Sequence, residues 1–325
     1  MTDLRPAVSI CIPVYNGSHF LERCFASIAA QTWQDFEIIV VDDGSQDDSA
    51  GNARRLMAHY GISGQVIRTE NHGCEQARDV ACDAARADVI APFDCDDLWE
   101  PEYLAHVLAA LRSHPDIDFV YCDSIEVFAD TGAKKLKSEE AHWIDLTRAS
   151  RDGDLYRFGR GEFFAMLLRG QVLFPPCTMF KRSLYGRAGR YADLDLRISL
   201  DWSFGLRASR VGTVAFLNQP LLRKFNHGAN VSGDPVRTLT SDLKVIRSLL
   251  DGKILAPGER AQVKGLAAAR AAHISYAMRT THRNRLQALK WSLASFSYAP
   301  NLKAVKLMLT ALMPRAILDR RRAAA

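Results

Sequence analysis

The chain has 325 residues, of which 48% are hydrophobic and 24% are charged, and its net charge is +5. This length favours a main domain with an additional region over a single compact domain. The seven cysteines lie singly, a pattern typical of reduced cytosolic thiols and not of a disulfide framework. The first apolar run is too short for a signal peptide, and no uncharged run reaches the roughly 18 residues of a transmembrane helix. We therefore expect a cytoplasmic protein.

Short apolar runs alternate with helical patterns over the first 128 residues. The predicted strands lie at residues 8–12, 36–41, 65–68, 88–93 and 118–127, and the predicted helices at 20–30, 48–60, 75–86 and 101–112. Nearly continuous apolar strands separated by helices are typical of parallel strands that are buried on both faces. The sequence therefore predicts an α/β fold, an open, twisted, mostly parallel sheet with helices on both faces.

Polar loops follow three of these strands, at residues 13–16, 42–45 and 94–97. In open α/β sheets, ligands bind beyond the carboxyl ends of the strands. We therefore expect the three loops to converge on one crevice, in which two of them are acidic. A glycine-rich dinucleotide fingerprint and a Walker P-loop are both absent from the sequence, so neither kind of nucleotide site is predicted.

The third loop places three carboxylates, Asp94, Asp96 and Asp97, within four positions. Like charges this close need a counter-charge, and carboxylates at strand ends suit Mg²⁺ or Mn²⁺ bound together with substrate phosphates. The alternative is that Asp97 caps the helix at 101–112, but capping does not explain Asp94 and Asp96. A D-x-D motif by itself is a weak signal.

Tyr15 and Asp43 each allow two interpretations. The Tyr15 ring can stack on a base, or it can cover the end of the sheet as a core aromatic residue. The Asp43 carboxylate can accept hydrogen bonds from a nucleobase or a ribose, or it can make an Asx turn with Gly44 and Ser45.

Six segments follow one another in a fixed order and spacing, at residues 8–15, 31–37, 40–45, 71–73, 77–79 and 94–97. As an ordered set they resemble the N-terminal half of the family 2 glycosyltransferases, which have the GT-A fold. The resemblance is strong up to Trp99 and continues weakly to about Ser232. It implies a nucleotide-diphosphate-sugar donor, with a UDP-sugar favoured, and a saccharide or lipid-linked acceptor. It also implies Mn²⁺ or Mg²⁺ at the D-x-D loop and transfer with inversion.

The resemblance assigns donor contacts to Pro13, Tyr15, Asp43 and Asp94, the first three at the nucleoside and the last at the ribose or sugar. It implies that Asp96 and Asp97 bind the metal and that Arg78 faces the phosphates. Asp79 stands where the family usually has asparagine, which places a further acid near the donor site.

The second half of the main domain is less clearly patterned. Residues 129–160 are rich in charge and predict a variable loop or excursion, followed by a helix that carries Asp201 and a strand at 213–217. Inverting members of the family carry a Glu-Asp pair at the start of a helix. Here Leu200 replaces the first acid, and Asp201 is the candidate general base, with a helix N-cap as its alternative role. His227, in a segment that resembles H-x-x-N-x-S, is implied to approach the metal or the diphosphate, with a structural role as its alternative.

The chain from about residue 239 onward has a helical pattern. From Arg260 to the end it holds 13 basic residues and only Asp319 as an acid, so this part carries +12 and the remainder −7. Residues 302–313 predict an amphipathic helix with a basic edge, which fits peripheral contact with the cytoplasmic face of the inner membrane or, alternatively, a packed helix with a solvated face. Nucleic acid is not expected, because stacking aromatics do not alternate with the basic residues.

Together these patterns predict two domains, a GT-A glycosyltransferase domain at residues 1–235 and a basic helical region at 236–325. Within the first, residues 1–128 are expected to bind the nucleotide sugar and 129–235 to hold the acceptor and the catalytic residue. The leading hypothesis is a metal-dependent inverting glycosyltransferase of polysaccharide or glycolipid assembly. The alternative is a non-catalytic membrane-associated nucleotide-sugar-binding or scaffold protein, suggested by Leu200 and the basic region. A nucleotidyltransferase would need a glycine-rich activating loop, which residues 13–18 do not offer.

Overall fold

The computed structural model describes residues 5–128, 130–226 and 235–312. The chain divides into two compact units, Met1–Asn230 and Val231–Ala325, close to the boundary that the sequence places after residue 235. Within the described ranges, no helix is both long enough and apolar enough to cross a membrane.

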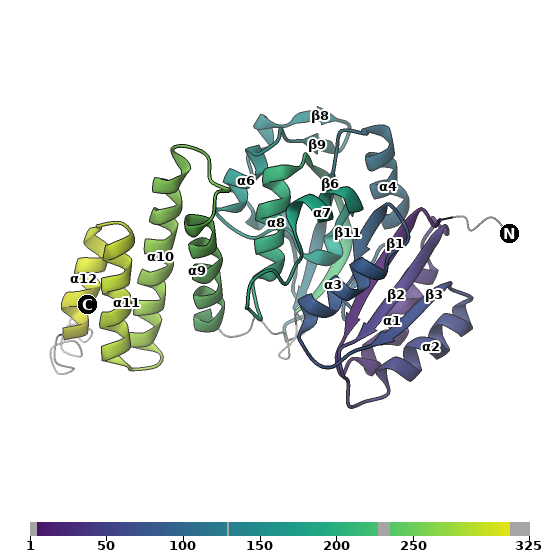
Figure 1. The fold of residues 1–325 in the computed structure, drawn as a ribbon, viewed down its shortest axis with the longest axis horizontal. Coiled ribbons are helices and arrows are strands. Elements are labelled where there is room, and N and C mark those ends of the chain that lie inside the picture. The colour runs from purple at the N-terminus through teal and green to yellow at the C-terminus, as the bar shows by residue number, and fades with distance from the viewer. Residues whose placement is uncertain (1–4, 129, 227–234, 313–325) are drawn as a thin grey trace. The chain divides into compact units, whose positions relative to one another are not determined.

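An 11-stranded sheet forms the centre of the first unit (Figure 1). Its strands are β1 (Val8–Val14), β2 (Phe36–Asp42), β3 (Gly64–Arg68), β4 (Val89–Pro92), β5 (Leu98–Trp99), β6 (Phe119–Phe128), β7 (Lys134–Leu136), β8 (Ser150–Asp152), β9 (Leu155–Arg157), β10 (Thr178–Lys181) and β11 (Val214–Asn226). The order along the sheet is β3-β2-β1-β4-β10-β6-β11-β9-β8, while β5 pairs with β11 and β7 with β6.

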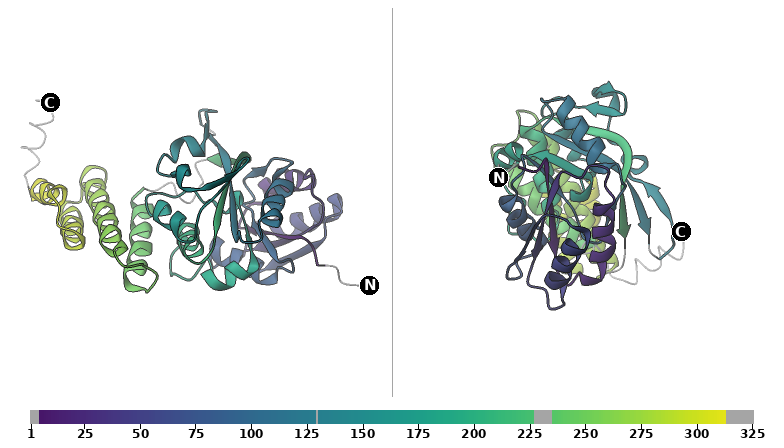
Figure 2. Two further views of the ribbon diagram at one scale, coloured as in Figure 1. Left: turned by 90° about the horizontal axis from the view of Figure 1, so that it is seen from above. Right: turned by 90° about the vertical axis from the view of Figure 1, so that its right-hand side faces the viewer.

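Most of the long strands pair in parallel, as predicted. β1 to β4 form one parallel block, and β6 and β11 form a second. β10 runs antiparallel between β4 and β6 and joins the two blocks. Every residue of β1 and β2 is buried, because helices cover both faces of the sheet (Figures 1 and 2). Burial on both faces is the physical reason that these strands are continuous apolar runs in the sequence.

The helices of the first unit are α1 (Ser18–Ala29), α2 (Ser49–Tyr60), α3 (Cys74–Ala84), α4 (Tyr103–Ser113), α5 (Lys137–Glu140), α6 (Glu162–Leu167), α7 (Arg182–Ala188) and α8 (Leu200–Val211). The four helices predicted before residue 113 are confirmed. Of the two alternatives for residues 129–160, the plain loop is wrong and the excursion is correct for the described residues 130–160, because they contain β7, α5, β8 and β9. All three residues of β8 are exposed, so no apolar period marks it in the sequence.

Strand β11 is longer than the predicted strand at 213–217. It continues to Asn226 because its second part also pairs with β6, after register shifts between Leu217 and Leu222. Pro220 lies between the two shifts and interrupts the strand pattern in the sequence. This extension carries Arg223, Lys224 and Phe225 along the sheet.

The second unit is helical, as predicted, with α9 (Pro235–Asp251), α10 (Glu259–Thr280), α11 (Arg285–Tyr298) and α12 (Leu302–Leu312) following one another in Figure 1. Small residues line the contact between α10 and α11. The Ser275 hydroxyl donates to the carbonyl of Ala288 (2.7 Å) and lies 2.7 Å from the hydroxyl of Ser292. Side chains this small let the two helices pack closely.

Candidate functional site

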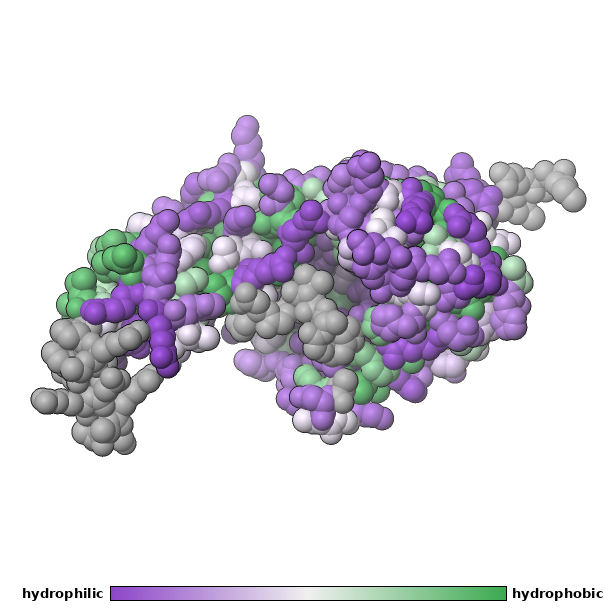
Figure 3. Space-filling model, turned by 90° about the horizontal axis from the view of Figure 1, so that it is seen from below, coloured by the Kyte–Doolittle hydropathy of each residue, from purple (hydrophilic) through white to green (hydrophobic). Residues whose placement is uncertain are grey.

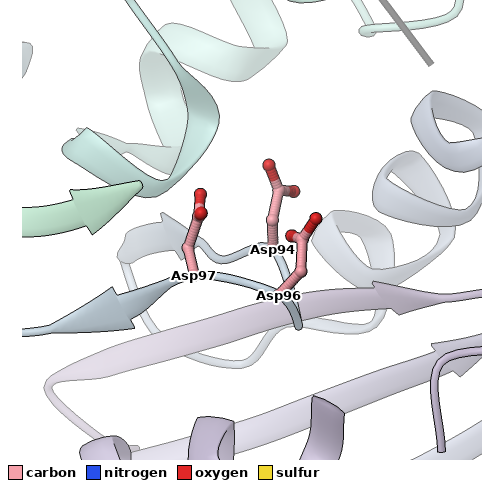
Figure 4. A group of neighbouring side chains, drawn as sticks. All are labelled: Asp94, Asp96 and Asp97. Atoms are coloured by element: carbon pink, nitrogen blue, oxygen red, sulfur yellow. The ribbon is translucent and has the colours of Figure 1, made fainter. Parts of the chain in front are cut away.

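The loop between β4 and β5 carries a cluster of three carboxylates. One oxygen each of Asp94, Asp96 and Asp97 lies within 4.8 Å of the others, and in the described part of the chain this is the one such group of three potential metal ligands. Figure 4 shows the three side chains projecting to the same side of the loop. Asp97 is buried, whereas Asp94 and Asp96 are partly exposed.

The two carboxylate oxygens of Asp97 differ in their hydrogen bonding. Its Oδ1 accepts a hydrogen bond from the backbone N–H of Phe225 on β11 (2.9 Å). Its Oδ2 is buried, has no hydrogen-bond partner among the described residues and lies 3.7 Å from Nζ of Lys224. Burial raises the pKa of Asp97 to about 7, and Asp96 and Asp94 add to the effect against the opposing charge of Lys224.

The position of helix α4 excludes one of the two roles that the sequence allows for Asp97. Helix α4 begins at Tyr103 after Glu102, so the prediction that Asp97 caps this helix is wrong. A buried carboxylate oxygen without a partner is costly unless a cation or a donor meets it. Three carboxylates within reach of one another, one of them with such an oxygen, fit a hard divalent cation with oxygen ligands.

Lys224 was not found from the sequence. Its side chain is 19% exposed, and its ammonium lies 4.9 Å from the centre of the Phe174 ring. Burial lowers the pKa of Lys224, but four carboxylates together raise it above its ordinary value, those of Asp97, Asp94, Asp96 and Asp201. The ammonium is therefore charged and interacts with the whole acidic group.

Arg78 holds Asp94 in the cluster. It is buried in α3, where its Nη2 donates to Oδ1 of Asp94 (2.5 Å) and its Nη1 pairs with Glu75. Its guanidinium also lies 5.3 Å from the centre of the Tyr191 ring. Burial raises the pKa of Glu75 to about 7, although Arg78 opposes this shift. Arg78 is thus a fixed buried cation between two acids.

Asp43 joins three segments at the carboxyl ends of the strands. Its N–H donates to the carbonyl of Val14 (2.9 Å), and its two carboxylate oxygens accept from the N–H groups of His72 (2.9 Å) and Gly73 (2.8 Å). Gly73 has a φ of 102°, a conformation that favours glycine. The Asx-turn interpretation of Asp43 is wrong, because its carboxylate oxygens bond to His72 and Gly73, and the N–H of Ser45 donates to Oδ1 of Asp42 instead (2.9 Å).

Pro13 and Tyr15 lie at the end of β1 beside Asp43. Pro13 is buried in register with Val41 of β2. Tyr15 is 50% exposed, so the alternative that it is a core aromatic residue is wrong. Its ring is accessible at the edge where the strands end, as base stacking requires.

Asp201 lies in the first turn of α8, two residues after the N-cap Ser199, so its interpretation as the N-cap is wrong. Its Oδ1 accepts from the N–H of Trp202 (2.8 Å) and its Oδ2 from Nε2 of Gln171 (3.1 Å). Burial raises the pKa of Asp201, and the charge of Asp94 adds to this. Asp201 and the cluster thus act on each other electrostatically, and a carboxylate with a raised pKa suits proton abstraction near neutral pH.

The Asp79 carboxylate makes its hydrogen bonds outside the acidic cluster. It is buried and accepts from the hydroxyl of Tyr185 (2.6 Å) and the N–H groups of Tyr191 (2.8 Å) and Ala192 (2.9 Å), so its oxygens hold the loop that carries Tyr191. The expectation that Asp79 adds an acid near the donor site stays a prediction. His227 lies outside the described residues.

Solved structures of nucleotide-sugar-binding proteins share this fold. The crystal structure of Staphylococcus aureus TarS 1–349 in complex with UDP-GlcNAc has a TM-score of 0.61 and 17% identity, over 95% of this chain and 80% of that chain. The mannosyltransferase PcManGT from Pyrobaculum calidifontis, in complex with GDP-Man and Mn²⁺, has a TM-score of 0.57 and 18% identity over the same fractions. The chain therefore has a GT-A type fold.

The family follows from the sequence. The model of glycosyl transferase family 2 matches residues 9–188, more than half of the chain, so the chain belongs to this family. EpsH of Bacillus subtilis, described as a glycosyltransferase, is 37% identical over 136 residues, which make up 42% of this chain and 38% of EpsH. The match thus spans about two fifths of the length of that relative.

Proposed function

We propose that the protein is a metal-dependent, inverting glycosyltransferase that uses a nucleoside-diphosphate sugar, with a UDP-sugar favoured. The observation that carries the proposal is the meeting of Asp94, Asp96 and Asp97 with an open, buried oxygen on Asp97. The UDP-GlcNAc bound by TarS and the GDP-Man and Mn²⁺ bound by PcManGT support this donor class and a divalent ion.

In this proposal Asp96 and Asp97 would hold Mn²⁺ or Mg²⁺. When bound, the ion neutralises the diphosphate and so assists its departure. The N–H of Phe225 fixes the orientation of the Asp97 carboxylate. Arg78 holds Asp94, which contacts the ribose or the sugar.

The nucleoside lies against the ends of β1 and β2. The exposed ring of Tyr15 stacks on the base beside Pro13, and the Asp43 carboxylate accepts hydrogen bonds from the nucleoside. Because two backbone N–H groups already hold that carboxylate, its orientation is set before the donor arrives. Arg78 adds positive charge on the side of the phosphates.

Asp201 is the general base. It takes the proton of the acceptor hydroxyl while the hydroxyl oxygen attacks the anomeric carbon and the bond to the diphosphate breaks. A single direct displacement of this kind inverts the configuration at that carbon. Gln171 and the N–H of Trp202 hold the two carboxylate oxygens and so orient the base.

The test is a screen of UDP- and GDP-sugars against hydroxyl acceptors with Mn²⁺, with the anomeric configuration of the product read by NMR. We expect transfer with inversion, loss of turnover in Asp96→Asn and Asp201→Asn, and calorimetric UDP binding that survives in Asp201→Asn. Retention of configuration, or full activity in either variant, would contradict the proposal. Donor binding without turnover across all acceptors would instead support a non-catalytic nucleotide-sugar-binding protein, the alternative suggested by Leu200.

The second unit supports a membrane partner, and we propose that it contacts an anionic lipid surface during polysaccharide or glycolipid assembly. Helix α12 buries Ala304, Leu307 and Ala311 against its own unit. It still exposes apolar side chains on another side, namely Leu302 (88%), Val305 (38%), Leu309 (56%) and Leu312 (62%). Lys303 and Lys306 are exposed beside them, and Figure 3 shows hydrophobic surface next to hydrophilic surface at the end formed by α11 and α12. Exposed leucines flanked by lysines are typical of helices that lie on anionic membranes.

A further inference from the structure

Two adjacent cations of β11 have different partners. Arg223 has a side chain that is 52% exposed, and its Nε lies 2.5 Å from Oε1 of Glu100. Lys224 has a side chain that is 19% exposed, and its Nζ lies 3.7 Å from Oδ2 of Asp97. Because successive side chains of a strand point to opposite faces, the fold directs Lys224 toward the acidic cluster and Arg223 away from it.

Lys224 lies beside the oxygen of Asp97 that has no hydrogen-bond partner among the described residues. The N–H of Phe225 already donates to Oδ1 of Asp97, so Oδ2 is the more open of the two oxygens for another cation. At 3.7 Å the ammonium of Lys224 is an ion-pair neighbour and too distant for a normal hydrogen bond. A divalent ion on Oδ2 and an ammonium beside it would repel each other. Lys224 and the metal therefore compete for this oxygen.

Phe174 gives the ammonium of Lys224 a second contact. The centre of its ring lies 4.9 Å from Nζ of Lys224 and 5.2 Å from Nζ of Lys137. Lys137 has its own anionic partner, Glu126, at 3.5 Å. An aromatic face attracts an ammonium at this distance. Lys224 can thus stay beside the acidic cluster, against the Phe174 ring, when it leaves Asp97.

We infer that Lys224 couples metal binding to donor binding. The inference rests on the proposed function, since it takes the acidic cluster as the metal site. Without donor, Lys224 neutralises Asp97 and weakens the binding of a divalent ion. When a nucleoside diphosphate enters, its phosphate oxygens attract the ammonium away from Asp97, so the metal gains Oδ2 and the diphosphate gains a cation. Because such coupling is reciprocal, the metal strengthens diphosphate binding by the same factor.

The test measures Mn²⁺ binding by calorimetry and by the EPR signal of free Mn²⁺, with and without UDP, in the wild type, Lys224→Met and Lys224→Arg. We expect Lys224→Met to bind Mn²⁺ alone about 5- to 10-fold more tightly than the wild type. The factor by which UDP increases Mn²⁺ affinity should be about tenfold smaller in this variant, a change within the usual range of coupling factors. Lys224→Arg should stay close to the wild type. Arg223→Met is the matched control and should change neither quantity.

A double-mutant cycle with Asp97→Asn separates this role from a structural one. Once Asp97 lacks its charge, Lys224→Met should raise Mn²⁺ affinity clearly less than it does in the wild-type background, because the competition for the Asp97 oxygen is gone and only the longer-range charge of Lys224 on Asp94 and Asp96 remains. Circular dichroism checks folding, and Lys224→Gln replaces Lys224→Met if the latter does not fold. Equal Mn²⁺ affinity and coupling in Lys224→Met and the wild type would overturn the inference and leave the proposed function intact. A wild type that binds no Mn²⁺, with or without UDP, would overturn both.

Discussion

The acidic cluster of the first unit and the basic helices of the second unit differ in how their charges are arranged. In the cluster, opposite charges meet at fixed distances, as in the pairs of Arg78 with Asp94 and of Lys224 with Asp97. From Arg260 onward the sequence holds 13 basic residues and a single acidic one, and the described helices there expose leucines. The first arrangement suits a small ligand whose charges have set positions, and the second suits an extended anionic surface. Single substitutions should therefore change activity or stability strongly in the cluster and change membrane binding only slightly on the helices.

The largest effect is expected at Asp201. Asp201→Asn removes the proposed base, so kcat for transfer should fall about 10³-fold, within the range for the loss of a general base. UDP affinity should change less than threefold, because the proposed nucleoside contacts, Tyr15 and Asp43, lie at the ends of β1 and β2. The exposed Asp195→Asn, on the segment before α8, is the control and should keep full activity. Stopped-time product assays at saturating donor measure the change, and an unaltered kcat in Asp201→Asn would remove this residue from the chemistry.

The same carboxylate predicts a pH dependence. Burial raises the pKa of Asp201, so its basic form is lost as the pH falls through that raised value. The logarithm of kcat/KM should therefore decline toward acid with unit slope, starting above the ordinary range of an aspartate. This decline should be absent from the residual activity of Asp201→Asn. A wild-type profile that is flat down to pH 4 would argue against the assignment.

Arg78 should have the largest effect on stability. Arg78→Met leaves Glu75 and Asp94 without their buried counter-charge, which should lower the free energy of unfolding by about 3 kcal/mol, as for other broken buried pairs. Arg157→Met breaks an exposed pair with Asp116 (2.9 Å) and should cost less than about 1 kcal/mol. Urea titrations of both variants measure the difference. Equal losses would show that the Arg78 pair is no more important than a surface pair.

Glu75 should make stability depend on pH. Its pKa is raised from 4.5 to about 7, so the folded state favours the protonated acid, and the stability that this contributes at low pH is lost as the pH rises through 7. Glu75→Gln cannot ionise. Between pH 5 and pH 8 its free energy of unfolding should therefore fall by about 2 kcal/mol less than that of the wild type. The exposed Glu70→Gln should behave as the wild type does, and parallel curves for all three proteins would refute the prediction.

The smallest single-site effects are expected on the second unit. Leu302→Asp or Leu309→Asp alone should weaken sedimentation with anionic vesicles a few-fold, and the double variant about tenfold or more, because each leucine adds its own buried area. Transfer to a water-soluble acceptor should not change. Gln287→Asp combined with Ser297→Asp adds the same charge at exposed polar positions and should reduce binding less. Equal losses in the two double variants would show that charge alone matters, without insertion of the leucines.

The sequence predicted those features that depend on local pattern. Apolar runs located the parallel strands, and the rule that ligands bind at strand ends placed Tyr15, Asp43 and the D-x-D loop at one edge. The hydrogen bonds of the loop at residues 42–45 were harder to predict, because either of the neighbouring acids Asp42 and Asp43 could make them. The N–H of Ser45 donates to Asp42 and not to Asp43, and the short elements within residues 130–160 were not predicted because short exposed strands have no apolar period.

Only the tertiary structure decided which charges meet. The antiparallel position of β10 and the extension of β11 bring Lys224 and Phe225 to Asp97, more than 120 positions away in the chain. The same packing brings the Asp79 carboxylate to the N–H of Tyr191 and the Arg78 guanidinium to the Asp94 carboxylate. A sequence pattern reports the period of one segment, whereas an ion pair depends on strand order and register across the sheet. The sequence by itself therefore determined the family and the acidic loop, and the fold determined the cation that balances it.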